Sequence, residues 1–147
     1  MIKSLFILIL SSFLFSFTIW QSDFQNALNE AKGKHELILI NFSGSDWCGP
    51  CIRMKKEIFD SPVFLEMAET NLVLFNADFP RSKKNQLPKK IQDQNNELAE
   101  RYNSVGKFPL TVLIDENGKV LQTWEGLPSE NAPAFTASIK KICDAHR

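Results

Sequence analysis

Hydrophobic positions divide the chain into segments with helical and strand-like periodicity. In residues 22–33 the apolar side chains recur every three or four positions, which predicts a short amphipathic helix capped by Ser22 and ended by Gly33. Residues 36–42 form a nearly continuous apolar run of strand length, typical of a central strand that is covered on both faces. A second apolar strand is expected over residues 72–78.

The segment between these two strands has the pattern of consecutive helices. From Gly49 the apolar positions follow a helical period, and Ser61-Pro62 then ends one helix and caps another, which stops at Asn71. A helical crossover between two strands of one sheet makes those strands parallel and the connection right-handed. We therefore expect strands 36–42 and 72–78 to run parallel in one sheet.

The remaining chain is expected to form a surface segment, a helix, a hairpin and a last helix. Residues 79–91 contain two prolines and five basic residues, which fits either a solvated loop or a docking surface for an acidic partner. Residues 92–102 predict an exposed helix. Strands 109–114 and 119–124 flank an Asn-Gly turn, so they should pair antiparallel. A helix over residues 129–145 completes the chain.

The chemistry of the chain is concentrated in residues 47–51, Trp-Cys-Gly-Pro-Cys. Cys48 and Cys51 can close a small disulfide ring and reopen it. The attacking species in disulfide exchange is the thiolate, and the first turn of a helix would favour that anion through its unpaired N–H groups and its macrodipole. Pro50 suits this position because its φ is already helical. Cys51, one turn into the helix, would be the more buried thiol.

This motif and its surroundings resemble the thioredoxin superfamily. A strand runs into the motif, a helix follows it, and Phe108-Pro109 precedes a later apolar run. The resemblance covers the chain from Phe24 to the C-terminus. It implies an α/β thioredoxin fold, with a mixed sheet of four to five strands and helices on both faces.

The same resemblance implies a thiol-disulfide oxidoreductase that reduces or isomerises protein disulfides. Cys48 would attack, and Cys51 would resolve the resulting mixed disulfide. Its partners would be protein thiols and disulfides, together with an electron donor or acceptor that the sequence does not identify. The redox-active Cys48–Cys51 disulfide would need no cofactor. The Gly-Pro pair between the cysteines resembles that of reducing members of the superfamily.

Other residues are expected to support this site. By resemblance, Phe108 would offer its backbone to an extended substrate, and Pro109, after a cis peptide bond, would keep metal ions away from the sulfurs. Trp47 is expected to pack beside the exposed sulfur and shield it. The supporting residues are Trp47, Gly49, Pro50 and Pro109.

The chain also departs from the superfamily pattern. Asn41 stands where thioredoxins commonly carry a buried acid, and an amide cannot accept a proton at neutral pH. Either water or Asp46 would then assist the second cysteine. Leu74 stands in place of a lysine near that acid, and Leu110 in place of the threonine that follows the proline. These differences argue against a general-purpose thioredoxin. The turn Phe42 to Asp46 and the basic segment after Asp78 resemble a branch of exported bacterial thioredoxin-like proteins.

Other uses of the cysteines are less compatible with the sequence. A structural zinc site needs about four ligands, and no second close pair of ligands exists. The candidates are Cys48, Cys51, Cys143, His35 and His146. No metal site is therefore predicted. The alternative function is a thioredoxin-fold binding module for a protein partner or a soft metal such as Cu(I), without redox turnover. Cys143 is interpreted as a structural thiol, with a resolving or regulatory thiol as the alternative.

Residues 1–20 combine an early lysine, Lys3, with a long uncharged apolar run. This pattern is typical of a secretory signal peptide, and an uncleaved membrane anchor is the alternative. Either one places the thioredoxin-like domain, residues 21–147, outside the cytoplasm, in the periplasm or secreted. Contact with a membrane is expected only through residues 1–20, if they are not cleaved.

Composition and charge limit the possible domain count and partners but do not indicate a function. The chain has 147 residues, of which 44% are hydrophobic and 23% charged, which fits one ordinary globular domain. Seventeen basic residues balance seventeen acidic ones, so the net charge gives no indication of a nucleic-acid partner. Three cysteines are an odd number, which does not fit a disulfide framework, and the close pair in an α/β pattern indicates redox chemistry.

Overall fold

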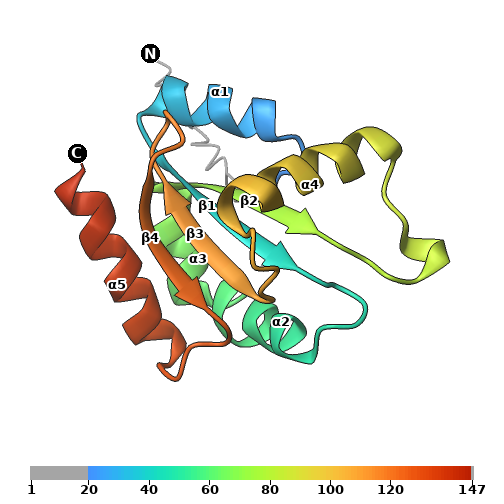
Figure 1. Cartoon of the computed structure of the whole chain (residues 1–147). Helices are drawn as coiled ribbons and strands as arrows, with labels where there is room; N and C mark the ends of the chain where they lie inside the picture. The colour runs from blue at the N-terminus through green and yellow to red at the C-terminus, as the bar shows by residue number, and fades with distance from the viewer. Residues whose placement is uncertain (1–19, 147) are drawn as a thin grey trace, which may run out of the picture.

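The computed structural model describes residues 20–146. The predicted leader, residues 1–20, lies outside the described residues except for Trp20. The described chain forms a mixed four-stranded sheet with helices on both faces (Figure 1), which confirms the predicted fold class. None of the helices within residues 20–146 is long and apolar enough to cross a membrane.

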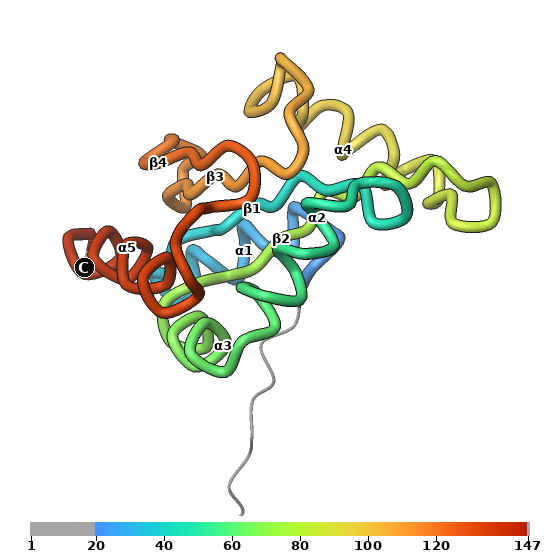
Figure 2. The backbone as a smooth tube through the Cα atoms, turned by 90° about the horizontal axis from the view of Figure 1, so that it is seen from below, coloured from blue at the N-terminus to red at the C-terminus, as the bar shows by residue number. Residues whose placement is uncertain are grey.

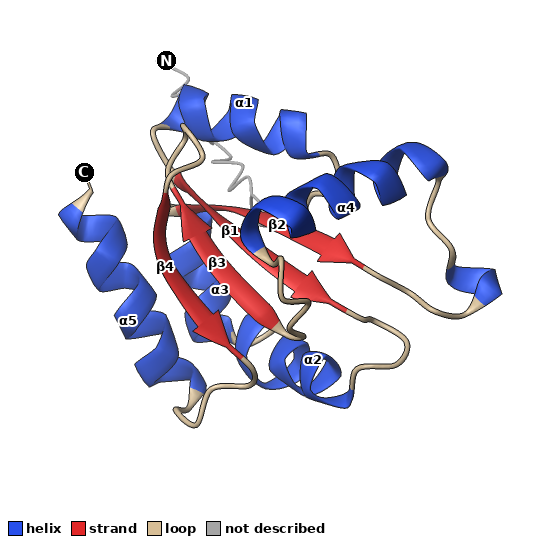
Figure 3. Cartoon of the chain, in the orientation of Figure 1, coloured by secondary structure: helices blue, strands red, loops and turns tan. Residues whose placement is uncertain are grey.

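The order of the elements is the predicted one (Figure 3). In chain order they are α1 (Phe24–Lys34), β1 (Leu37–Ser43), α2 (Gly49–Met54), the π-helical turn η1 (Lys55–Phe59), α3 (Pro62–Glu69), β2 (Leu72–Asp78), the 3₁₀ turn η2 (Lys83–Asn85), α4 (Lys89–Tyr102), β3 (Leu110–Ile114), β4 (Val120–Glu125) and α5 (Ala132–Ala145).

The sheet has the strand order β2-β1-β3-β4. β1 and β2 are parallel, as the helical crossover predicts, and β3 and β4 form the predicted antiparallel hairpin. β1 also pairs antiparallel with β3, so β1 is a central strand. Every residue of β1 is buried, because each face of the sheet is covered by helices.

Alternate residues of the strands contribute to two separate cores. On one face, Leu39 and Leu74 pack with side chains from α2, η1, α3 and α5. On the other face, Ile40 and Phe75 pack with α1 and α4. Figure 2 shows α4 on one side of the sheet and α3 and α5 on the opposite side.

Three helices begin or end at residues other than those predicted. α1 is capped by Asp23, whose carboxylate accepts the Asn26 N–H, and not by Ser22. It ends at His35, whose φ of 55° is left-handed, and not at Gly33. At the start of α1, an aspartate one residue after Ser22 makes the cap that Ser22 was expected to make. At its end, histidine adopts the left-handed conformation more readily than most residues.

The other two helices start at different residues than predicted. α4 begins at Lys89, three residues before the predicted start, because Pro88 precedes it with a backbone suited to a helix entry. α5 begins at Ala132, capped by Asn131, whose side chain accepts the Ala134 N–H. The predicted start at residue 129 is therefore wrong by three residues.

Candidate active site

Cys48 and Cys51 form a disulfide across the first turn of α2. Cys48 is the N-cap residue, and its sulfur accepts the Cys51 N–H at 3.2 Å. Gly49 and Pro50 occupy the first two helical positions and are exposed. The motif thus begins a helix, as the position of Pro50 predicts.

The two cysteines are equally buried. Cys48 and Cys51 are each 4% exposed, so the expectation that Cys51 is the more buried residue is wrong for this disulfide form.

The Trp47 indole is held by groups from several segments. Its Nε1–H donates to the Phe79 carbonyl at 2.7 Å, and its ring meets the Phe108 ring edge-on at 5.4 Å between centroids. The Arg81 guanidinium lies over the indole at 3.6 Å from the ring centre. A Cβ on Gly44 would come within 2.2 Å of this ring, so the turn before the motif requires glycine there.

Phe108 and Pro109 lie on the same side of the molecule as the cysteines. The Phe108–Pro109 peptide bond is cis, and the Phe108 ring packs against both Trp47 and Phe79. Pro109 is buried, and its carbonyl accepts the Gly126 N–H at 2.9 Å. The structure therefore brings the two parts of the predicted site together.

A cavity of about 290 Å³ lies beside Cys51. Its apolar walls come from Trp20, Ile52 and Phe59, and its polar ones from Asn41, Ser43, Ser45, Lys55 and Asn76. Within residues 20–146, no carboxylate side chain lines this cavity. The space next to the second cysteine is therefore bordered by neutral polar groups and one exposed lysine.

Like Ser43, Asn41 is a buried polar residue of this cavity. It is 7% exposed, and its Nδ2 donates to Asn76 Oδ1 at 3.0 Å, an oxygen that also accepts from Ser43 Oγ at 3.0 Å. The buried Asn41 Oδ1 has no hydrogen-bond partner within residues 20–146. This leaves one acceptor available for a donor inside the cavity.

Sequence reasoning missed Asn76 and Ser43. Asn76 is opposite Asn41 in the parallel register, whereas Leu74 is opposite Leu39 and belongs to the core. The expected neighbour of Asn41 was therefore assigned two residues too early. The signal was available, since Asn76 is a polar residue that interrupts an otherwise apolar strand.

Asp46 anchors the segment after β2. Its carboxylate accepts the Arg81 N–H, the Ser82 N–H and the Asn85 side-chain N–H, each at 2.9 Å. These hydrogen bonds, the one from Arg81 first, lower the pKa of Asp46 below its ordinary value of 3.8. A carboxylate with both oxygens occupied and a lowered pKa is a poor base, so the suggestion that Asp46 assists the second cysteine finds no support.

Replacing Asp46 with alanine should release this segment. We expect trypsin to cut Asp46→Ala after Arg81, Lys83 or Lys84 roughly tenfold faster than the wild type, because local opening controls cleavage of a folded chain. Limited digestion followed by mass spectrometry measures this rate. Asp144→Ala, which removes an exposed carboxylate on α5, is the control and should be cut like the wild type.

The same anchor predicts a dependence on pH. Because the pKa of Asp46 is lowered in the folded protein, its stabilising effect is present above the ordinary value and is lost as the pH falls through the folded value. Hydrogen exchange should therefore show the Arg81 and Ser82 amides protected at neutral pH and unprotected in acid. Equal protection at both pH values would contradict the proposed anchor.

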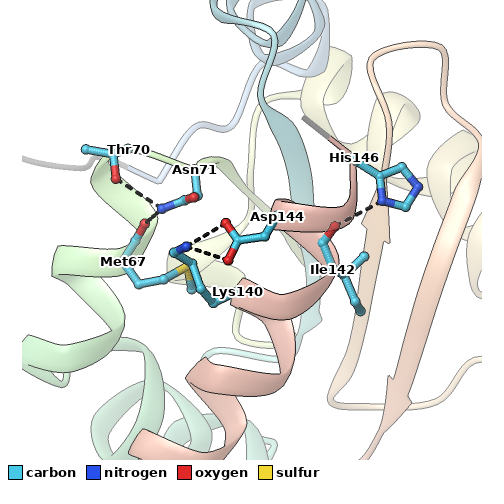
Figure 4. A network of polar contacts seen from close by, with 7 residues as sticks. All are labelled: Met67, Thr70, Asn71, Lys140, Ile142, Asp144 and His146. Carbon is cyan, nitrogen blue, oxygen red and sulfur yellow. Dashed lines mark hydrogen bonds and ion pairs between the residues drawn. The ribbon is translucent and has the colours of Figure 1, made fainter.

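Cys143 lies far from the motif along the sheet. It lies on α5, is 3% exposed, and packs in the core with side chains of η1 and α3. It borders the same cavity as Leu37, at the start of β1, whereas Cys48 follows the end of β1. Figure 4 shows this end of α5 beside the end of α3. The position fits a structural thiol and not a resolving one.

The two histidines lie at this same end of the sheet. His35 and His146 border the cavity that contains Cys143, and the His146 Nδ1 is 3.0 Å from the Ile142 carbonyl (Figure 4). The candidate zinc ligands are thus divided between opposite ends of β1. Across residues 20–146, no group of three His, Cys, Asp or Glu side chains is arranged to hold a metal ion.

Comparison with known proteins gives a consistent result. Residues 24–142 match the family model of the thioredoxin-like domain. The chain is 36% identical over 121 residues to the disulfide bond reductase DsbH of Chlamydia pneumoniae, covering 82% of this chain and 70% of that protein. It is 29% identical to the thioredoxin-related protein DsbJ of the same organism over 127 residues, which are 86% of this chain but 36% of DsbJ.

Solved structures show the same fold. A DsbH oxidoreductase structure has a TM-score of 0.79 at 32% identity, covering 88% of this chain and 86% of that one. A thioredoxin from Thermus thermophilus has a TM-score of 0.62 at 18% identity, covering 86% of this chain and 88% of that one. The second comparison supports the fold alone.

These findings show that the chain belongs to the thioredoxin-like family. Its fold, its paired cysteines and its similarity to DsbH make it a thiol-disulfide oxidoreductase.

Proposed function

We propose that this protein reduces disulfide bonds of proteins outside the cytoplasm, with Cys48 as the attacking residue and Cys51 as the resolving one. One observation carries the proposal. The Cys48–Cys51 disulfide lies at the start of α2, and the contact between Trp47 and Phe108 brings the Phe108–Pro109 segment to the same place. A substrate strand lying along Phe108 would have its own disulfide near Cys48.

The reaction transfers two electrons to the substrate. The Cys48 thiolate attacks one substrate sulfur, a mixed disulfide forms, and the first substrate thiolate leaves and takes a proton. Cys51, as a thiolate, then attacks the Cys48 sulfur. The Cys48–Cys51 disulfide closes, and the second substrate thiolate leaves. The disulfide seen in the structure is the product of this cycle, so an external dithiol donor must reduce it again.

The surrounding residues would have separate tasks. As N-cap, Cys48 lies at the positive end of the helix, which stabilises its thiolate. Gly49 and Pro50 keep the ring short and are themselves exposed beside the buried sulfurs. Phe108 would present its backbone to the substrate, and Pro109 would shield the sulfurs from metal ions. Trp47 would hold the turn before Cys48 in place through its contacts.

The direction of electron flow is proposed from the similarity to DsbH, which is named a disulfide bond reductase. The similarity also favours turnover over a binding module that merely holds a partner or a soft metal. We expect a reduction potential for the Cys48–Cys51 pair nearer to the −270 mV of thioredoxin than to the roughly −180 mV of protein disulfide isomerase. Equilibration with defined dithiol buffers measures it. A value near that of the isomerase would contradict a reductase.

Export is proposed from residues 1–20. Their uncharged apolar run after Lys3 is typical of a signal peptide or an N-terminal anchor. Residues 1–20 fused to alkaline phosphatase, which folds only under oxidising conditions, should give active phosphatase in bacteria. An inactive fusion that accumulates in the cytoplasm would contradict export.

A further inference from the structure

The segment between β2 and α4 is strongly basic although the whole chain is neutral. Residues 79–92 contain five basic residues and no acidic one. Lys89 pairs with Asp93, and Lys90 lies 3.9 Å from Asp23. The other three basic side chains are exposed and form no ion pair within the described part of the chain. They are Arg81, Lys83 and Lys84, which we call the basic loop.

The basic loop is held in one place by several hydrogen bonds. Asp46 accepts hydrogen bonds from the Arg81 and Ser82 N–H groups and from the Asn85 side chain. The Gln86 side chain donates to the Pro80 and Ser82 carbonyls, so the backbone that carries the three basic side chains is fixed. The single negative charge of Asp46 offsets one of the three positive charges, so the loop keeps an excess of positive charge. Side chains on an ordered backbone lose less entropy on binding than those on a mobile one.

The basic loop is continuous with the active site. Arg81 lies over the indole of Trp47, the residue directly before Cys48. Phe79, where the segment begins, packs against Phe108. A peptide lying along Phe108 with its disulfide at Cys48 would therefore reach Arg81 within a few residues. In Figure 1 the segment extends from the end of β2 away from the sheet.

We infer that the basic loop selects protein substrates that carry acidic residues within a few positions of the attacked cysteine. This inference rests on the proposed function and adds its substrate class. Complementary charge close to a reactive site raises the rate of productive encounter and disfavours partners of like charge. The effect weakens with salt, because the Debye length falls from about 30 Å at 0.01 M to about 3 Å at 1 M.

The test uses three disulfide-bonded peptides that differ only in the residues flanking one cysteine, which are Glu, Gln or Lys. At low salt we expect kcat/KM for the Glu peptide to exceed that for the Lys peptide about tenfold, with the Gln peptide between them. At about 1 M salt this ratio should fall to less than about twofold.

Two triple variants distinguish an effect of the basic loop from an effect of the protein's net charge. In Arg81→Gln/Lys83→Gln/Lys84→Gln we expect the ratio between Glu and Lys peptides to fall to near one at low salt. The matched control is Lys32→Gln/Lys119→Gln/Lys141→Gln, which removes three exposed charges elsewhere and should keep the tenfold ratio. Circular dichroism checks that each variant folds. A further variant, Lys83→Gln/Lys84→Gln, keeps the contact between Arg81 and Trp47 and should lower the ratio between Glu and Lys peptides only partly.

The outcomes distinguish the inference from the proposed function. If the wild type reduces the Gln peptide but shows no charge preference, the inference fails and the reductase stands. If no peptide is reduced, the proposed function fails. If the peptides show no preference but the basic loop is required for binding vesicles with about 30% anionic lipid, the surface binds membranes and the substrate inference is overturned.

Discussion

Cys48→Ser should lose disulfide reduction by at least about a thousandfold. A serine hydroxyl cannot form the mixed disulfide. In the proposed mechanism the remaining Cys51, the third residue of α2, resolves a mixed disulfide and does not attack the substrate first. Loss of a nucleophile commonly removes most of the rate enhancement of an enzyme. Reduction of insulin by a dithiol, followed as turbidity, measures the effect.

Two variants serve as controls for this loss. Cys143→Ala changes the cysteine in the core near α3 and α5, so it should keep its activity even if its free energy of unfolding decreases. Glu66→Gln alters an exposed residue on α3 and should be indistinguishable from the wild type. Full activity in Cys48→Ser would reject Cys48 as the attacking residue.

Cys51→Ser should capture substrates instead of releasing them. With no second thiolate, the mixed disulfide at Cys48 persists until an external thiol breaks it. Non-reducing electrophoresis should show covalent adducts that disappear with dithiothreitol and are absent in Cys48→Ser/Cys51→Ser. Adducts that survive in the double variant would assign the capture to Cys143.

Periodic apolar segments made the fold predictable from sequence. The run over residues 36–42 was expected to be a strand covered on both faces, and all of β1 is buried. The helical pattern after Gly49 required a crossover, and β1 and β2 are parallel. The Asn-Gly turn predicted the β3–β4 hairpin. The strand and helix patterns report the burial of apolar surface. The turn pattern reports a backbone requirement, since Gly118 has a φ of 81°.

Features that depend on single contacts were not predictable in the same way. Either Ser22 or Asp23 could cap α1, and a local hydrogen bond decides between them. The role of Asp46 depends on residues 35 to 39 positions later in the chain, which no local pattern relates to it. The π-helical turn η1 interrupts a regular apolar period, so the sequence pattern is that of an ordinary helix.

In the active site, too, the sequence motif was predictable and the contacts that depend on strand register were not. The motif predicted a disulfide at a helix start, and the structure has one. The position beside Asn41 was assigned to Leu74, because the register between β1 and β2 cannot be read from either strand alone. The register places Asn76 there, so the second cysteine faces a cavity bordered by amides and hydroxyls, with one lysine.

Asn41→Asp should make the stability of the protein depend strongly on pH. The new carboxyl would be almost fully buried, facing Asn76 Oδ1, and burial raises the pKa of a carboxyl. The one lysine that borders the cavity, Lys55, is exposed and pairs with Asp60. A raised pKa means that the folded state binds the proton more tightly. The variant should therefore match the wild type most closely near pH 4 and lose stability as the pH rises towards the folded value.

The expected loss is large. A shift of about 2 to 3 pH units corresponds to roughly 3–4 kcal/mol of unfolding free energy at pH 8, at 1.36 kcal/mol per unit. Urea unfolding at pH 4 and pH 8 measures it. Asn41→Leu is the matched control because it has no titratable group, so its difference from the wild type should be the same at both pH values.

The same variant connects the cavity to the reaction. The cavity borders Cys51, so an ionised carboxylate there can accept the Cys51 proton, and release of the second substrate thiol should accelerate over the pH range in which stability falls. Asn41→Leu should show no such acceleration. If Asn41→Asp differs from the wild type equally at pH 4 and pH 8, the new carboxylate is well solvated, and the cavity beside Cys51 is not the desolvated space that its geometry indicates.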